Sequence, residues 1–176
     1  SNFRAGVNAG NSIASGGNYN TVVGDEAGTA ITTGDSNVFV GYQSGDATTT
    51  ADSNVGIGRG TLSTNILSDH NTAVGNGALF THNQTSTTDS YNTAVGSNAG
   101  AVVTTGVQNT IIGGLAGDAL TTGSYNVILG TNGGGGVTTG SQNIIIGQGT
   151  AMAALTGSLN TIVGDSAGAA MTSGTL

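Results

Sequence analysis

The sequence contains no cysteine, proline or tryptophan, and only 6% of its 176 residues are charged. Its two basic residues, Arg4 and Arg59, leave a net charge of −7. Nucleic acids and anionic membrane surfaces bind clustered basic residues, so we expect neither as a partner. No apolar run reaches the ~18 residues of a membrane-spanning helix, so we expect no insertion of this segment into a membrane. The absence of cysteine leaves the redox compartment open.

A strict repeat separates this chain from the disordered linkers that share its glycine-, serine- and threonine-rich composition. The motif Asn-x-apolar-(Val/Ile/Leu)-Gly recurs every 17 residues, with one interval of 21 and a degenerate first copy. Each copy corresponds to one turn of the chain, and the turns begin at Asn2, Asn20, Asn37, Asn54, Asn71, Asn92, Asn109, Asn126, Asn143 and Asn160. The sequence therefore predicts a single repeat domain over residues 1–176.

Glycine closes every complete copy of the motif, four residues after its asparagine. These structural turn glycines are Gly24, Gly41, Gly58, Gly75, Gly96, Gly113, Gly130, Gly147 and Gly164. A column that permits only glycine indicates a backbone with positive φ or a close approach by another segment of chain. Seventeen residues are too few for a strand, a helix and their connections, so a wholly parallel β-coil remains. We therefore predict an all-β fold, a parallel β-solenoid of about ten turns.

The three residues before each of these glycines predict a strand that is apolar on both faces. The first and third residues, such as Val38 and Val40, share one face because side chains alternate along a strand, and we expect that face to point into the coil. The middle residue then points outward, yet it is apolar too, which predicts a partner chain. The residues expected at this oligomer interface are Val22, Phe39, Ile111, Ile128, Ile145 and Ile162.

Two neighbouring turns depart from the repeat. The turns that begin at Asn54 and Asn71 carry Leu62 and Leu79 where most copies have glycine, and a four-residue insertion lies within 79–91. Insertions in solenoids emerge as loops on one face. If the chain contacts a ligand, we therefore expect the contact in this irregular region. The candidate ligand-binding loop comprises His82, Asn83, Gln84 and Tyr91.

Asn-x-x-Val-Gly strands, Ala-Gly corners and Thr-Thr-Gly returns run through essentially the whole chain. This pattern, seen for example in Val38-Phe39-Val40-Gly41, resembles the left-handed parallel β-roll heads of YadA-like trimeric autotransporter adhesins, although the period here is longer. It is also similar to the shafts of phage and algal-virus tail fibres. The resemblance implies a left-handed coil, assembly into a homotrimer, and a location on a virion or cell surface.

Asp35, Asp52 and Asp69 follow one another at the 17-residue period and should stack on three consecutive turns. A Ca²⁺ ion bound between them would relieve their repulsion, so they are a candidate calcium site; the alternative is a solvated acidic stripe. No ordered set of His, Cys and carboxylate side chains predicts a zinc site or a nucleophile. We therefore expect no enzyme, and no cofactor other than calcium.

A stack of similar turns gives length and rigidity, and side loops can bind a cell-surface glycan or protein receptor weakly but many times over. We therefore expect an extracellular structural and adhesive fibre segment, a module of a viral tail fibre or a bacterial surface adhesin that attaches to host cells. Two alternatives remain open. Repeated Thr-Thr pairs are compatible with an ice- or surface-binding solenoid, and open coil ends are compatible with a self-assembling extracellular filament.

Overall fold

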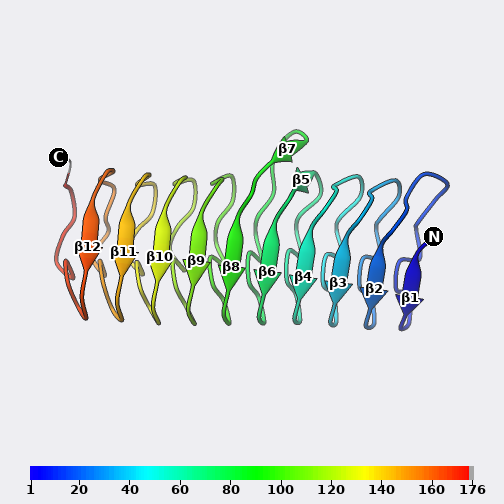
Figure 1. The fold of residues 1–176 in the computed structure, drawn as a ribbon, viewed down its shortest axis with the longest axis horizontal. Coiled ribbons are helices and arrows are strands. Elements are labelled where there is room, and N and C mark those ends of the chain that lie inside the picture. The colour runs from blue at the N-terminus through cyan, green and yellow to red at the C-terminus, as the bar shows by residue number, and fades with distance from the viewer. Residues whose placement is uncertain (175–176) are drawn as a thin grey trace.

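Ten three-residue strands lie side by side in one parallel sheet, in the order in which they occur along the chain (Figure 1). The computed structural model describes residues 1–174, and no helix occurs in that range. The strands are β1 (Phe3–Ala5), β2 (Thr21–Val23), β3 (Val38–Val40), β4 (Val55–Ile57), β6 (Thr72–Val74), β8 (Thr93–Val95), β9 (Thr110–Ile112), β10 (Val127–Leu129), β11 (Ile144–Ile146) and β12 (Thr161–Val163). The predicted parallel β-solenoid is confirmed.

Each coil of the solenoid corresponds to one sequence repeat. Neighbouring strands pair residue for residue, so that Val22 lies beside Phe39 and Ile128 lies beside Ile145. Because paired strands lie about 4.8 Å apart, the coils stack into a rod with β1 and β12 at opposite ends (Figure 1). The extra residues of the long repeat leave the sheet undisturbed, since β6 pairs directly with β8. They project above the row of coils, where β5 (Ser68–Asp69) pairs with β7 (Thr88–Asp89).

A ladder of buried asparagines joins successive coils. The Oδ1 atom of Asn20 accepts hydrogen bonds from the backbone N–H and the side-chain amide of Asn37, at 2.9 and 3.1 Å. The same amide of Asn37 donates to the carbonyl of Ala51 across the coil, at 2.8 Å. From Asn20 onward the ladder asparagines are at most 7% exposed, so these bonds are made away from water. The asparagine that marks the repeat is therefore a structural side chain.

The glycine after each strand meets both conditions that the sequence suggested. Its φ lies between 122° and 138° in all nine copies, a region that side-chain-bearing residues rarely adopt. At Gly113 an added Cβ would also lie 2.5 Å from the carbonyl oxygen of Gly130 in the next coil. Successive coils therefore meet backbone against backbone at this corner, and a side chain would separate them.

The two faces of the strand are the reverse of our prediction. The middle residues point into the coil and form its core, with exposures of 0% for Val22, Phe39, Ile111, Ile128 and Ile145 and 7% for Ile162. These six residues are therefore not an oligomer interface. The first and third residues point outward instead, and the side chains of Ile112 and Ile144 are 41% and 42% exposed. Since both faces are apolar, alternation alone could not show which one lies inside.

Candidate functional site

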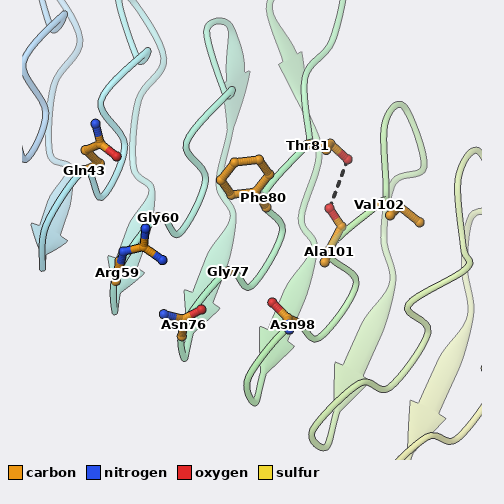
Figure 2. Close-up of a pocket in the computed structure, with 10 residues that line it drawn as sticks. All are labelled: Gln43, Arg59, Gly60, Asn76, Gly77, Phe80, Thr81, Asn98, Ala101 and Val102. Carbon is orange, nitrogen blue, oxygen red and sulfur yellow. Dashed lines mark hydrogen bonds between the residues drawn. The ribbon is translucent and has the colours of Figure 1, made fainter.

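A hollow of about 310 Å³ lies on the side of the rod at the irregular turns (Figure 2). Four consecutive turns contribute to its wall. The side chains that line it include Gln43, Arg59, Asn76, Phe80, Asn98 and Val102. Its volume lies at the lower end of the range for small-ligand sites, and its wall combines an aromatic ring, a cation and three amides. This hollow is the candidate functional site of the chain.

The hollow exists because two consecutive turns exchange a glycine for a leucine. In most turns the sixth residue after the ladder asparagine carries an outward side chain, as Gln43 does, and the eighth is glycine. In the two irregular turns the sixth residue is Gly60 or Gly77, and the eighth is Leu62 or Leu79. All four have a left-handed backbone, with φ of 62° and 66° at the glycines and 50° and 48° at the leucines. The surface therefore loses an outward side chain in two adjacent coils.

The two inward leucines occur in coils whose strands carry small residues in the core. The middle residue of β4 is Gly56 and that of β6 is Ala73, where most other strands carry valine, phenylalanine or isoleucine. Leu62 and Leu79 belong to this part of the core and are 0% exposed. Leu79 reaches the next coil, where an added Cβ at Gly100 would lie 3.3 Å from its Cδ2. Burying each leucine contributes about 1.5–3 kcal/mol, which offsets the roughly 1–2 kcal/mol cost of a left-handed backbone at a residue with a Cβ. The buried leucines thus accompany the loss of outward side chains in the two coils that form the hollow.

Phe80 forms the apolar side of the hollow. Its ring lies over Gly60, where an added Cβ would be 3.5 Å from two ring carbons, and its side chain is 44% exposed. Figure 2 shows this ring standing above a row of polar side chains, Arg59, Asn76 and Asn98, that come from three consecutive coils. A flat apolar surface therefore faces hydrogen-bonding groups across a gap that contains no side chain from Gly60 or Gly77.

Arg59 supplies the positive charge of the hollow. Its guanidinium lies 6.0 Å from the centre of the Tyr42 ring, a distance at which a cation is attracted to the face of an aromatic ring. Among residues 1–174 the one ion pair joins His70 to Asp89, so Arg59 has no carboxylate partner in that range. A guanidinium that is exposed and unpaired is suited to bidentate binding of a carboxylate.

His82, which we predicted to lie in a ligand-binding loop, is instead buried inside the coil, at 0% exposure. It occupies the interior position that Ile31 and Leu120 hold in other turns. Its Nε2 lies 3.4 Å from the amide nitrogen of Asn92, and its Nδ1 has no hydrogen-bond partner within residues 1–174. Burial lowers the pKa of His82 from 6.5 to about 4, although the backbone of Thr104 raises it in part. The ring is therefore neutral near pH 7, and its assignment as a ligand-binding residue is wrong.

The other three residues of the predicted loop lie outside the hollow's wall. The side chains of Asn83 and Gln84 form hydrogen bonds with the backbone of adjacent coils. Tyr91 stacks on His70 with ring centres 5.0 Å apart, and its hydroxyl donates to Asp89 at 3.1 Å. The hydrogen bond to the Asp89 carboxylate raises the pKa of Tyr91. These side chains thus secure the projecting insertion to the rod.

The three aspartates of the candidate calcium site stack as predicted, but their carboxylates bind backbone. Oδ1 of Asp52 accepts from the N–H of Asp35 at 2.6 Å, and Oδ1 of Asp69 accepts from that of Asp52 at 2.7 Å. Ser124 and Ser141 hold the same position in later coils and accept backbone N–H groups through Oγ. Within residues 1–174, no group of three or more His, Cys, Asp or Glu could hold a metal ion. A neutral hydroxyl serves as well as a carboxylate here, so the column requires no cation.

The outer face of the sheet is a second surface feature. The first and third strand residues form an aliphatic strip along the rod, interrupted by threonines at the first position. The aliphatic residues that form it are Val23, Val38, Val40, Val55, Ile57, Val74, Val95, Ile112, Val127, Leu129, Ile144, Ile146 and Val163. Ile57, Ile112, Ile144 and Val163 are 41–62% exposed. Because the strands are apolar on both faces, one apolar face remains uncovered by the chain. It is formed by the first and third strand residues, whereas we predicted the middle residues.

The sequence pointed to the two irregular turns but not to the residues that form the hollow. The missed signal was the exchange between the sixth and eighth positions: Gly60 and Gly77 remove outward side chains in consecutive turns, beside Arg59 and Phe80. No family model, curated protein or solved structure matches the chain. Within residues 1–174 no helix is long and apolar enough to cross a bilayer. Its function is therefore inferred from the rod, its outer strip and the hollow.

Proposed function

We propose that the chain is a segment of an extracellular structural and adhesive fibre, of a viral tail fibre or a bacterial surface adhesin, in which copies of the chain run side by side. The observation that carries this proposal is the aliphatic strip, which lies outside the core and follows the rod along its length. The asparagine ladder and the continuous backbone pairing support a stiff rod, because every coil is fixed to both neighbours.

A second copy of the chain is the partner that fits the strip. Side chains repeat along it at the strand spacing of about 4.8 Å. A partner that packs along the whole strip needs the same spacing, and another copy has it. Apolar sheet faces pack about 10 Å apart with interdigitating side chains, which would cover residues such as Ile112 and Ile144. In the homotrimer that the resemblance implies, three strips would face a common axis.

The test is the mass of the chain in solution, measured by light scattering for the wild type and for an Ile112→Lys/Ile144→Lys double variant. We expect the wild type to have the mass of three chains, and the variant to dissociate with its circular dichroism unchanged. Leu115→Lys is the matched control, since Leu115 is 40% exposed but lies outside the strands, and it should keep the wild-type mass. A wild-type mass of one chain, or a double variant that stays associated, would show that the strip is not the contact.

The threonine corners do not favour the ice-binding alternative. The hydroxyls of Thr32 and Thr121 each donate to a carbonyl of the following coil, at Thr49 and Thr138, at 3.1 Å. A hydroxyl that is engaged within the chain is not free to match an ice lattice. The first threonine of these pairs thus acts as a hydrogen-bonding corner of the rod, which supports the fibre proposal. Only the exposed second threonines, such as Thr105 and Thr122, remain available to the ice-binding alternative.

A further inference from the structure

We propose that the hollow binds a single sugar unit that carries a carboxylate, such as a uronic or sialic acid. In this arrangement Arg59 pairs with the carboxylate and Phe80 packs against the face of the sugar ring. The inference rests on the adhesive role proposed above, and it identifies the ligand class and the residues that recognise it.

The apolar side of the hollow suits a sugar ring. One face of a pyranose presents C–H groups, and such faces pack on aromatic rings. Phe80 offers an exposed ring over Gly60, and Val102, 37% exposed, extends the apolar surface. Toward Gly77 the gap is bounded by the side-chain oxygen of Asn98. A volume of about 310 Å³ is enough for one sugar unit. Because the hollow lies on the outer surface of the rod, the rest of a glycan can extend from it into solvent.

The polar side suits sugar hydroxyls. A hydroxyl both donates and accepts hydrogen bonds, and a primary amide also offers both functions. Gln43, Asn76 and Asn98 place three such amides around the gap. Gln43 is held in place by Glu26, with its Nε2 2.8 Å from the carboxylate, which leaves its carbonyl oxygen free to accept. A ring of amides around an aromatic face therefore matches a ligand with several hydroxyls better than an apolar peptide.

The charge selects a ligand with one anionic group. Arg59 is the single basic residue of the hollow, and Arg4, the other arginine of the chain, lies three strands away on β1. One guanidinium pairs bidentately with one carboxylate. A polyanion such as a nucleic acid would meet a chain with a net charge of −7 and no further cation in the hollow. The hollow thus favours a monocarboxylate sugar over a highly charged polymer.

The structure offers a variant that fills the hollow with little strain. Gly60→Asn would place an amide in the gap at φ 62°, and Asn98 and Asn132 already occupy the same position of other coils at φ 55° and 52°. An added Cβ at Gly60 meets Phe80 at an ordinary contact distance. Gly149→Asn is the matched control, because Gly149 holds this position at φ 58° in a distant coil. Equal denaturation midpoints of the two variants would show that Gly60→Asn is folded.

The experiment is saturation-transfer NMR on the whole chain, with methyl β-glucuronide and the methyl glycoside of N-acetylneuraminic acid as probes. Methyl β-glucoside is the neutral control. Inorganic sulfate, which has no protons to observe, is added as a competitor to test for an anion site without sugar recognition. We expect transfer to at least one acidic glycoside from the wild type and from Gly149→Asn. Gly60→Asn should abolish it, and Arg59→Gln should weaken the affinity at least about tenfold, because hydrogen bonds between ionised groups are the strong class.

Each contrary result would overturn the inference. Transfer that survives in Gly60→Asn would place the sugar elsewhere, and equal transfer to the glucoside would remove the role of the carboxylate. If sulfate displaced the bound acidic glycoside as effectively as free methyl β-glucuronide does, the hollow would be an anion site without sugar recognition. A wild type that forms the oligomer but binds neither acidic glycoside would refute the ligand inference and leave the fibre proposal standing.

Discussion

Replacing His82 by leucine should make the rod less sensitive to acid. His82 is the one buried histidine, at 0% exposure, and its Nδ1 has no hydrogen-bond partner within residues 1–174. Leucine occupies the same interior position at Leu120, so the substitution His82→Leu fits the pattern of the coil. The change removes a buried group that must stay neutral for the chain to remain folded, and it leaves the surface unaltered.

The size of the effect follows from the pKa of His82, which burial lowers from 6.5 to about 4. At 1.36 kcal/mol per pH unit, this difference corresponds to about 3 kcal/mol of folding free energy. Because the pKa is lower in the folded state, the unfolded chain takes up the proton first as the pH falls. The stability is therefore complete above about pH 6.5 and is lost progressively down to about pH 4.

Urea denaturation followed by circular dichroism, at about pH 7.5 and at about pH 4.5, measures this loss. We expect the advantage of His82→Leu over the wild type to grow by about 2–3 kcal/mol between the two conditions. Burial raises the pKa of Asp69 and Asp118, but both are present in both proteins and cancel in the difference. His70→Gln, which removes the exposed histidine, is the matched control for the loss of an imidazole. Parallel pH curves for His82→Leu and the wild type would refute the reasoning.

Four further substitutions test the repeat itself, and circular dichroism with urea denaturation measures whether each variant folds and how stable it is. Asn109→Ala should destabilise the chain by at least about 3 kcal/mol, since it removes two buried hydrogen bonds and leaves two buried donors of the next ladder asparagine without an acceptor. Gly113→Ala should prevent folding, whereas Gly114→Ala should be neutral because nothing lies within 4 Å of its added Cβ. Ile128→Asp should unfold the chain, as it buries a carboxylate in the core; a folded variant would show that this residue is not interior.

The period of the repeat predicted the fold because every coil must return to the same register. Two columns show how far this reasoning extends. The glycine column, as at Gly113, predicted a corner of the coil, and the aliphatic column before it, as at Ile112, predicted a strand. The alternation of side chains along the strand was not enough to predict which face lies inside the coil. Threonine at the first position, as at Thr110, was a usable sign of the outer face, because a solvated position tolerates a hydroxyl. The middle column also varies in size, from Gly56 to Phe39, which indicates packing against other side chains of an interior.

The hollow could not be predicted one residue at a time, because it depends on pairs of positions that compensate in volume. A third coil supports this interpretation: Gly149 also holds the sixth position, but the strand there has Ile145 in its middle, and the eighth residue is only Ala151. In that coil the larger strand residue accompanies a smaller inward partner. In the coil of β8, where Ala94 and Gly100 are both small, Leu79 of the preceding coil lies 3.3 Å from an added Cβ at Gly100.

The coil of Gly149 stands alone between coils that carry side chains at the sixth position, such as Asn132, so its gap is one coil wide, about 4.8 Å. Like the two irregular coils, the coil of β8 has a small core residue, Ala94, but it keeps Asn98 at the sixth position. A sugar ring needs the wider gap of Gly60 and Gly77, so glycine at the sixth position of two adjacent coils is the condition for a binding site on this rod.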